Sequence, residues 1–167
     1  MREKHHRLSR ESYRGKISAA FTLCLKAASP GFVEPRTIDV FVAMLGSAAL
    51  DASCVVPVYC YMPDHQHMIL TGTHDDSDLW EVVARYKQRS GFWMSKHTPT
   101  MQWQKDFYDH VIRAHEEVVA QVRYVLDNPV RSGLVSSWRE YPFKGSCGCD
   151  LEEVLKGVFW AGRRHAG

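Results

Sequence analysis

The chain has 167 residues, which is enough for one domain with a sizeable hydrophobic core, and its 45% hydrophobic content is typical of packed proteins. A formal net charge of +2 does not by itself identify a nucleic-acid-binding protein, and five cysteines without a paired CxxC motif predict neither a disulfide framework nor a zinc site. No apolar run approaches the roughly 20 residues of a membrane helix, and residues 1–16 lack the apolar segment of a secretory signal. We therefore expect a cytoplasmic protein without membrane contact.

The first predicted elements are a basic, loosely structured arm at residues 1–16 and a strand at 17–27, which Ser29-Pro30-Gly31 interrupts. Thr37 can then cap a helix. The apolar residues of this helix recur at helical spacing, namely Ile38, Phe41, Val42 and Leu45. One face of the helix is therefore expected to lie on a sheet.

Two strands follow at residues 54–61 and 65–71, close enough in sequence to pair as an antiparallel hairpin. Ser77 or Asp78 can cap a second helix, and residues 101–112 are typical of a fourth strand with its approach loop. The order strand, helix, strand, strand, helix, strand indicates an α+β protein of the ferredoxin-like, split βαβ class. In that fold both helices pack on one face of an antiparallel sheet.

A third helix is predicted at residues 115–128, ending where Pro129 interrupts the helical pattern. Its apolar residues form one stripe, namely Val118, Val119, Val122, Val125 and Leu126. Tyr124 lies almost opposite that stripe, with Gln121 and Asn128 about one turn away on either side. A helical tyrosine is usually an amphipathic surface residue, but this one lies among amide side chains, away from the packing face.

Two histidines, His65 and His67, follow the predicted turn Met62-Pro63-Asp64 at alternate positions. Alternate residues of a strand point to the same face, so the two imidazoles project together while Gln66 points to the other face. Imidazoles at this spacing can hold a divalent cation and leave further coordination positions open. An isolated His-x-His is more often a chance alternation, so the surrounding sequence decides the interpretation.

That surrounding sequence, MPDHQHMIL, resembles the HUH nucleases, and within them the single-tyrosine, REP-associated transposases. HUH stands for His, a hydrophobic residue and His. This sequence departs from the family pattern at two positions: Asp64 stands where Asn is usual, and Gln66 stands where an apolar residue is expected. The side chain of Gln66 is expected to point away from the metal, so its polarity should matter little for the chemistry. The segment RYVLDNPVRSGLV resembles the tyrosine helix of the same family. The resemblance covers residues 15–146. We expect a transposase domain at 17–146, including a C-terminal tyrosine-bearing helix, and a tail at 147–167 that contains a short helix.

The resemblance implies a DNA transposase, an endonuclease that cleaves and rejoins single-stranded DNA through a covalent 5′-phosphotyrosine. Carried over to this sequence, it makes Tyr124 the nucleophile, makes His65, His67 and Asn128 the metal ligands, and gives Gln121 an auxiliary role. The expected cofactor is Mg²⁺ or Mn²⁺, although Zn²⁺ or Ni²⁺ also suits imidazole. The expected partner is single-stranded DNA with hairpin structure.

Two other functions are compatible with the sequence: a domesticated binder of hairpin single-stranded DNA that no longer cuts, and a metal phosphodiesterase that uses water. The position of Tyr124 predicts either a homodimer that presents the tyrosine to a second subunit or a mobile tyrosine helix. Candidate phosphate contacts follow the histidine strand, namely Arg85, Lys87, Arg89 and Lys96. Cys147 and Cys149 are interpreted as two thiols in a glycine-containing loop.

Overall fold

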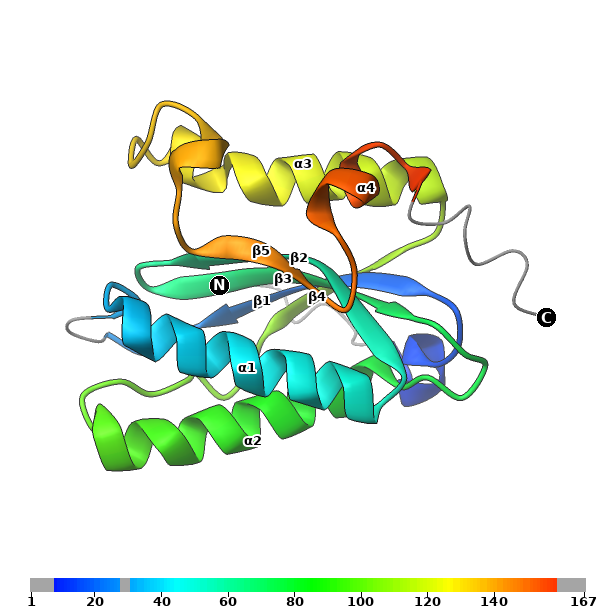
Figure 1. Ribbon diagram of the computed structural model, residues 1–167. Helices are drawn as coiled ribbons and strands as arrows, with labels where there is room; N and C mark the ends of the chain where they lie inside the picture. Colours follow the sequence, from blue (N-terminus) through cyan, green and yellow to red (C-terminus); the bar gives the residue numbers. More distant parts are fainter. Residues whose placement is uncertain (1–7, 28–30, 159–167) are drawn as a thin grey trace, which may run out of the picture.

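The structure is a computed structural model, and it describes residues 8–27 and 31–158 (Figure 1). The strands are β1 (Ser18–Cys24), β2 (Cys54–Met62), β3 (His65–Gly72), β4 (Tyr108–Ile112) and β5 (Lys144–Cys147). The helices are α1 (Pro35–Asp51), α2 (Leu79–His97), α3 (His115–Arg131) and α4 (Leu151–Leu155), with 3-10 turns η1 (Arg10–Tyr13) and η2 (Trp138–Glu140). Within the described part of the chain, no helix has the length and apolar character needed to cross a bilayer.

The five strands form one antiparallel sheet in the order β4-β1-β3-β2-β5. Helices α1 and α2 cover one face of this sheet, and α3 and α4 cover the other (Figure 1). The first four strands with α1 and α2 form the predicted split βαβ arrangement, and the tyrosine-bearing helix is added on the opposite face. The predicted fold class is therefore confirmed.

The fifth strand, β5, was not predicted, because its sequence KGSC has neither β-branched residues nor apolar alternation. It pairs with β2, where Lys144 lies opposite Cys60. Gly145 passes so close to Tyr59 that a Cβ atom would lie 2.6 Å from the phenol oxygen. Cys147 therefore lies in a strand and not in the expected loop, and burial raises the pKa of its thiol to about 11.

A hydrophobic core lies on each face of the sheet. The core under α1 and α2 contains the largest buried rings, including Tyr13, Phe21, Phe32, Phe41, Tyr61 and Tyr86. The core under α3 and α4 is built mainly from aliphatic side chains, including Val58, Ile69, Val118, Val122 and Leu126. Because residues alternate along β3, His65 and His67 share the face of Ile69 and lie on the side that α3 covers.

Gln66, the residue between the two histidines, is fully buried on the opposite face. Its Oε1 accepts a hydrogen bond from the Tyr86 hydroxyl at 2.6 Å, and the hydroxyls of Tyr86 and Tyr61 lie 2.9 Å apart. Burial raises the pKa of both tyrosines above the ordinary value, so both hydroxyls stay protonated near neutral pH. Gln66 therefore connects β3 to Tyr86 of α2 and, through Tyr86, to Tyr61 of β2. Its position between the two histidines in the sequence does not by itself indicate this structural role.

Replacing Gln66 by Leu is expected to lower the free energy of unfolding by about 1–3 kcal/mol, because the buried Tyr86 hydroxyl loses its acceptor. The double variant Gln66→Leu/Tyr86→Phe should lose less than the sum of the two single losses, since the orphaned hydroxyl is removed with its partner. Urea unfolding of the three variants measures these differences. Strictly additive losses would contradict a hydrogen bond between the two side chains.

The N-terminal segment departs from the loosely structured arm that the sequence predicts. Residues 10–13 form η1, and Tyr13 is fully buried, with its ring against Trp80 and its hydroxyl donating to Asp109. This buried ring attaches the segment to the core, and the basic residues around it hide that signal in the sequence. Residues 1–7, the rest of the predicted arm, lie outside the described residues.

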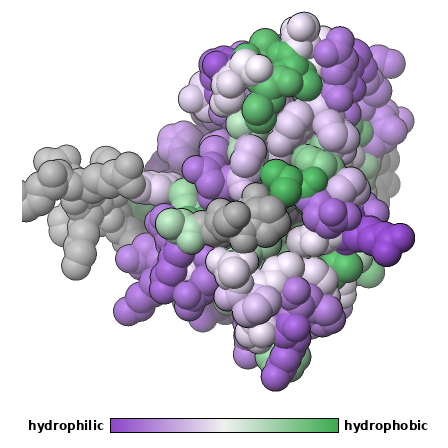
Figure 2. All heavy atoms as spheres, turned by 90° about the vertical axis from the view of Figure 1, so that its left-hand side faces the viewer, coloured by the Kyte–Doolittle hydropathy of each residue, from purple (hydrophilic) through white to green (hydrophobic). Residues whose placement is uncertain are grey.

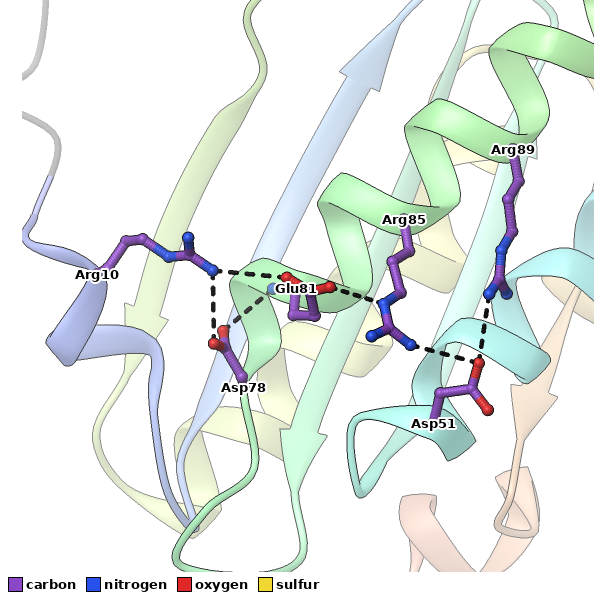
Figure 3. Close-up of polar contacts among 6 residues, drawn as sticks. All are labelled: Arg10, Asp51, Asp78, Glu81, Arg85 and Arg89. Atoms are coloured by element: carbon purple, nitrogen blue, oxygen red, sulfur yellow. Dashed lines mark hydrogen bonds and ion pairs between the residues drawn. The ribbon is translucent and has the colours of Figure 1, made fainter.

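Ion pairs on the outer surface of α2 join it to η1 and to the end of α1 (Figure 3). They are Arg10–Asp78, Arg10–Glu81, Arg85–Glu81, Arg85–Asp51 and Arg89–Asp51, with N–O distances between 2.6 and 3.6 Å. Such exposed pairs contribute at most about 1 kcal/mol each. Because α2 lies across the sheet from the histidines, Arg85 and Arg89 are not placed to bind a phosphate beside them.

Candidate active site

His65 and His67 bring their Nε2 atoms within 3.1 Å of each other, with ring centroids 4.7 Å apart and ring planes at 90°. Two nitrogens that bind one cation at about 2.1 Å, on adjacent octahedral positions, are about 3.0 Å apart. The observed spacing therefore fits two ligands of a single ion. The alternation of side chains along β3 produces this pair directly, as the sequence predicts.

The other nitrogen of each ring is fixed by a neighbouring side chain. His65 Nδ1 lies 2.6 Å from Asp64 Oδ1, and His67 Nδ1 lies 3.0 Å from Thr22 Oγ1 on β1. Burial, with smaller effects of His65 and Arg131, lowers the pKa of His67 to about 4. His67 is therefore neutral at neutral pH, and its Nε2 lone pair is available to a cation. Outer hydrogen bonds of this kind orient metal-binding histidines in proteins.

Replacing Thr22 by Val is expected to weaken the binding of Mn²⁺ by about 10- to 100-fold, because the imidazole of His67 loses the partner that fixes its orientation. Thr22→Ser keeps the hydroxyl and should bind Mn²⁺ nearly as the unmodified chain does. Calorimetric titration with Mn²⁺ measures both affinities. Equal affinities for Thr22→Val and the unmodified chain would show that this hydrogen bond does not support a metal site.

The helix α3, which carries Tyr124, extends through Pro129 to Arg131, so the predicted end at residue 128 is wrong. Proline lacks the N–H group that would bond to the carbonyl of Val125. Asn128 supplies the missing donor, since its Nδ2 lies 3.3 Å from Val125 O. The helix can therefore continue for another turn, and the side-chain amide of Asn128 is held by its nitrogen, which leaves its oxygen to other partners.

Tyr124 lies on the side of α3 opposite the packing stripe, as predicted, and is 58% exposed. The guanidinium of Arg131 stacks on its ring, with Cζ 3.9 Å from the ring centroid. The same guanidinium donates through Nη2 to Asn128 Oδ1 at 2.7 Å. Gln121 is half-buried and lines a cavity of about 460 Å³ between β4 and α3, together with His110 and Arg113.

The structure thus brings the candidate residues together in two groups. One is the histidine pair, and the other is Tyr124 with Asn128, joined by Arg131. Among the described residues no hydrogen bond connects the two groups, although α3 packs against β2 and β3 and the charge of Arg131 acts on His67. The described residues contain no cluster of three His, Cys, Asp or Glu side chains suited to a metal.

Figure 2 views the end of the molecule at which the β2–β3 turn and the C-terminal end of α3 lie. On this face, hydrophobic patches are separated by hydrophilic and intermediate ones.

The sequence profile of a family described as "Transposase IS200 like" matches residues 16–126, which is more than half of the chain and includes His65, His67 and Tyr124. The chain belongs to the IS200-like transposase family. The match ends two residues before Asn128, which therefore lies outside the matched region.

Two curated relatives resemble this IS200-like chain over most of the same region. It is 29% identical over 111 residues to the REP-associated tyrosine transposase of Escherichia coli K12, covering 64% of the chain and 62% of that protein. It is 23% identical over 114 residues to a protein of Haemophilus influenzae Rd named as a putative REP-associated tyrosine transposase, covering 62% and 64%. The chain therefore spans less than two thirds of the length of these relatives.

A solved structure shares the fold of this IS200-like chain with a TM-score of 0.70, at 20% identity, covering 86% of the chain and 82% of its own. It is described as "Structure of the REP associates tyrosine transposase bound to a REP hairpin". At this identity the likeness establishes the shared fold.

Three residues around the site of this IS200-like chain were missed by sequence reasoning. Asp64 is adjacent to His65, and that proximity is a signal which could have been used. Thr22 lies 45 positions from His67 and becomes its neighbour only through the pairing of β1 with β3. Arg131 follows Pro129, where the helix was expected to have ended, so its position above Tyr124 could not be anticipated.

Proposed function

We propose that this chain is a metal-dependent transposase that cleaves and rejoins single-stranded DNA through a covalent 5′-phosphotyrosine at Tyr124. His65, His67 and Asn128 are the protein ligands of the cation, which is Mg²⁺ or Mn²⁺. Membership of the IS200-like family supports transposase chemistry. The observation that carries the proposal is the pair of Nε2 atoms 3.1 Å apart, each on a ring anchored through its Nδ1.

The donors present fit such a cation. A neutral imidazole at His67, a second imidazole at His65 and the amide oxygen of Asn128 are ligands that Mn²⁺ accepts, and three protein ligands leave positions for water and phosphate. A bound cation supplies positive charge that stabilises the charge developing on the phosphate during attack. The remaining steps belong to the side chains of the chain itself.

Tyr124 acts as the nucleophile. Its Oη attacks the phosphorus, the bond from phosphorus to the 3′-oxygen breaks as the new bond forms, and the 3′-oxygen leaves as a hydroxyl after gaining a proton. A free tyrosine has a pKa of about 10, so the phenol proton must pass to water or to a basic group during attack. Because the covalent bond conserves energy, a 3′-hydroxyl can later attack it and rejoin a strand without ATP.

Tyr124 must reach the histidine pair for this reaction. It is 58% exposed, and no hydrogen bond among the described residues joins it to either imidazole. Either α3 moves towards β3, or a second copy of the chain supplies the histidines in a homodimer. We assign single-stranded DNA with a hairpin as the substrate, because the structural neighbour is described as bound to a REP hairpin and the fold is shared.

The test is to incubate the protein with Mn²⁺ and labelled hairpin DNA that carries a single-stranded flank, and to look for a protein–DNA adduct that survives denaturation. An adduct supports the proposed function. Binding without cleavage would instead indicate a DNA-binding protein that no longer cuts. Cleavage without an adduct would indicate a phosphodiesterase that uses water, in which His65 and His67 act without Tyr124.

A further inference from the structure

Arg131, the last residue of α3, contacts both residues of that helix that the proposed chemistry uses. Its Cζ lies 3.9 Å from the centroid of the Tyr124 ring. Its Nη2 donates to Asn128 Oδ1 at 2.7 Å, and Nη1 donates to the carbonyl of Tyr124 at 3.3 Å. One side chain therefore holds the nucleophile and the amide ligand in a single arrangement.

The remaining partner of Arg131 is weakly held. Nη1 lies 3.3 Å from Asp127 Oδ2, and the two side chains are 38% and 49% exposed. An exposed ion pair between residues i and i+4 of a helix contributes little to stability. A phosphodiester oxygen, which belongs to a group with the same single negative charge, can therefore replace Asp127 without disturbing the contacts to Tyr124 and Asn128.

The position of Arg131 also relates it to the histidine pair. The C-terminal end of α3, which Arg131 forms, and the β2–β3 turn, which His65 follows, lie at the same end of the molecule (Figure 1). A phosphate attacked by Tyr124 must lie beside the Tyr124 side chain, whose ring Arg131 contacts. The planar guanidinium suits phosphate oxygens, because its N–H groups form directed, charge-assisted hydrogen bonds.

We propose that Arg131 binds the phosphate that Tyr124 attacks. It exchanges Asp127 for a non-bridging oxygen of that phosphate and keeps Asn128 and the tyrosine ring in place. Arg131 is thus a substrate-binding residue of the reaction and also positions its nucleophile. The inference rests on the proposed function. It adds to that function the residue that binds the attacked phosphate.

A double-mutant cycle between protein and DNA tests this contact. Tyr124→Phe, which keeps the ring under Arg131 but cannot form an adduct, serves as the background, so binding can be measured with Mn²⁺ present. In this background Arg131→Met should weaken binding of the hairpin DNA about tenfold, as expected for a hydrogen bond to a charged group. Replacing the scissile phosphate by an uncharged methylphosphonate should weaken binding at least as much, because the bound cation also loses the phosphate charge. The two changes together should weaken binding no further than the methylphosphonate alone.

Arg123→Met is the matched control, because it removes the same charge from the same helix. Arg123 donates to the carbonyl of Leu155 at 3.2 Å, and no hydrogen bond or cation–π contact found among the described residues joins its side chain to Tyr124 or Asn128. Its effect and that of the methylphosphonate should be additive. Arg131→Lys retains the charge without the planar fork, so it should recover only part of the binding. Thermal melting of each variant confirms that it is folded.

Additive losses for Arg131→Met and the methylphosphonate would overturn the assignment of Arg131. The failure of the proposed function is a separate result, since it appears as the absence of an adduct when the unmodified chain acts on unmodified DNA. A chain that does not bind hairpin DNA would overturn both. In the unmodified background, Arg131→Met should also slow adduct formation by about 10²- to 10³-fold, the effect of removing a group that stabilises developing charge.

Discussion

Replacing Tyr124 by Phe is expected to abolish the covalent protein–DNA adduct, with a loss of about 10⁴-fold or more in the rate of adduct formation. The change removes only the hydroxyl oxygen that attacks phosphorus, so the covalent bond to the DNA cannot form at this residue. Denaturing gels of labelled hairpin DNA, incubated with Mn²⁺ and protein, measure the rate.

The controls for this variant follow from the surroundings of Tyr124. The side chain is 58% exposed and its ring contacts Arg131, a contact that Phe can also make. The unfolding free energy should therefore change by no more than about 0.5 kcal/mol, and DNA binding should persist. Tyr108 on β4 is a useful comparison, because it is 49% exposed and lies opposite Thr22, as His67 does. An adduct that survives Tyr124→Phe but not Tyr108→Phe would assign the nucleophile to the other tyrosine.

The same variant decides how Tyr124 reaches the histidines. A chain with Tyr124→Phe retains the histidine pair, and a chain with His65→Ala retains the tyrosine. If one subunit supplies the tyrosine and another the histidines, mixing the two inactive chains should restore adduct formation at sites that combine intact halves. Restoration supports a homodimer, whereas its absence, with both chains folded and mixed before assembly, favours movement of α3 within one subunit.

The parts of this protein that could be predicted from sequence depend on local order. The turn at Met62-Pro63-Asp64 joins two adjacent strands, and alternation along one strand brings His65 and His67 together without reference to the rest of the fold. The position of Tyr124 opposite a stripe of valines is likewise a property of a single helix. In each case the relevant residues are separated by only a few positions.

The parts that could not be predicted depend on contacts between distant segments. Thr22 meets His67 only because β1 pairs with β3, and β5 forms because the edge of β2 accepts a strand whose own residues do not favour one. The helix continues past Pro129 because the side chain of Asn128 replaces a missing backbone donor. That compensation depends on the conformation of the Asn128 side chain. The general tendency of helices to end at proline takes no account of it.

Replacing His67 by Ala is expected to abolish the binding of Mn²⁺ at micromolar concentrations and to slow adduct formation by about 10³-fold. One of two adjacent imidazole ligands is lost, and with it the positive charge that stabilises the attacked phosphate. Calorimetric titration measures metal binding, and denaturing gels measure the adduct. Binding of hairpin DNA without metal should persist, which separates this effect from a loss of folding.

His74→Ala is the matched control, because His74 is an exposed imidazole on the loop after β3, bonded to the Thr73 hydroxyl at 2.8 Å. It should leave metal binding and adduct formation unchanged. If His67→Ala binds Mn²⁺ as the unmodified chain does, the two histidines are a chance alternation and not a metal site.

The metal-free protein offers an independent measure of the same residue. The pKa of His67 falls from 6.5 to about 4 on folding, so the unfolded chain binds a proton more readily than the folded chain between these values. The contribution of His67 to the free energy of unfolding should therefore be fully present above pH 6.5 and should decrease as the pH falls from 6.5 towards 4. Below pH 4 this residue should cause no further change in that free energy. The total contribution is about 3 kcal/mol.

Urea unfolding across this pH range tests the expectation. The His67→Ala variant should lack this part of the pH dependence, because it lacks the buried, neutral imidazole that produces it. The His74→Ala variant should retain it.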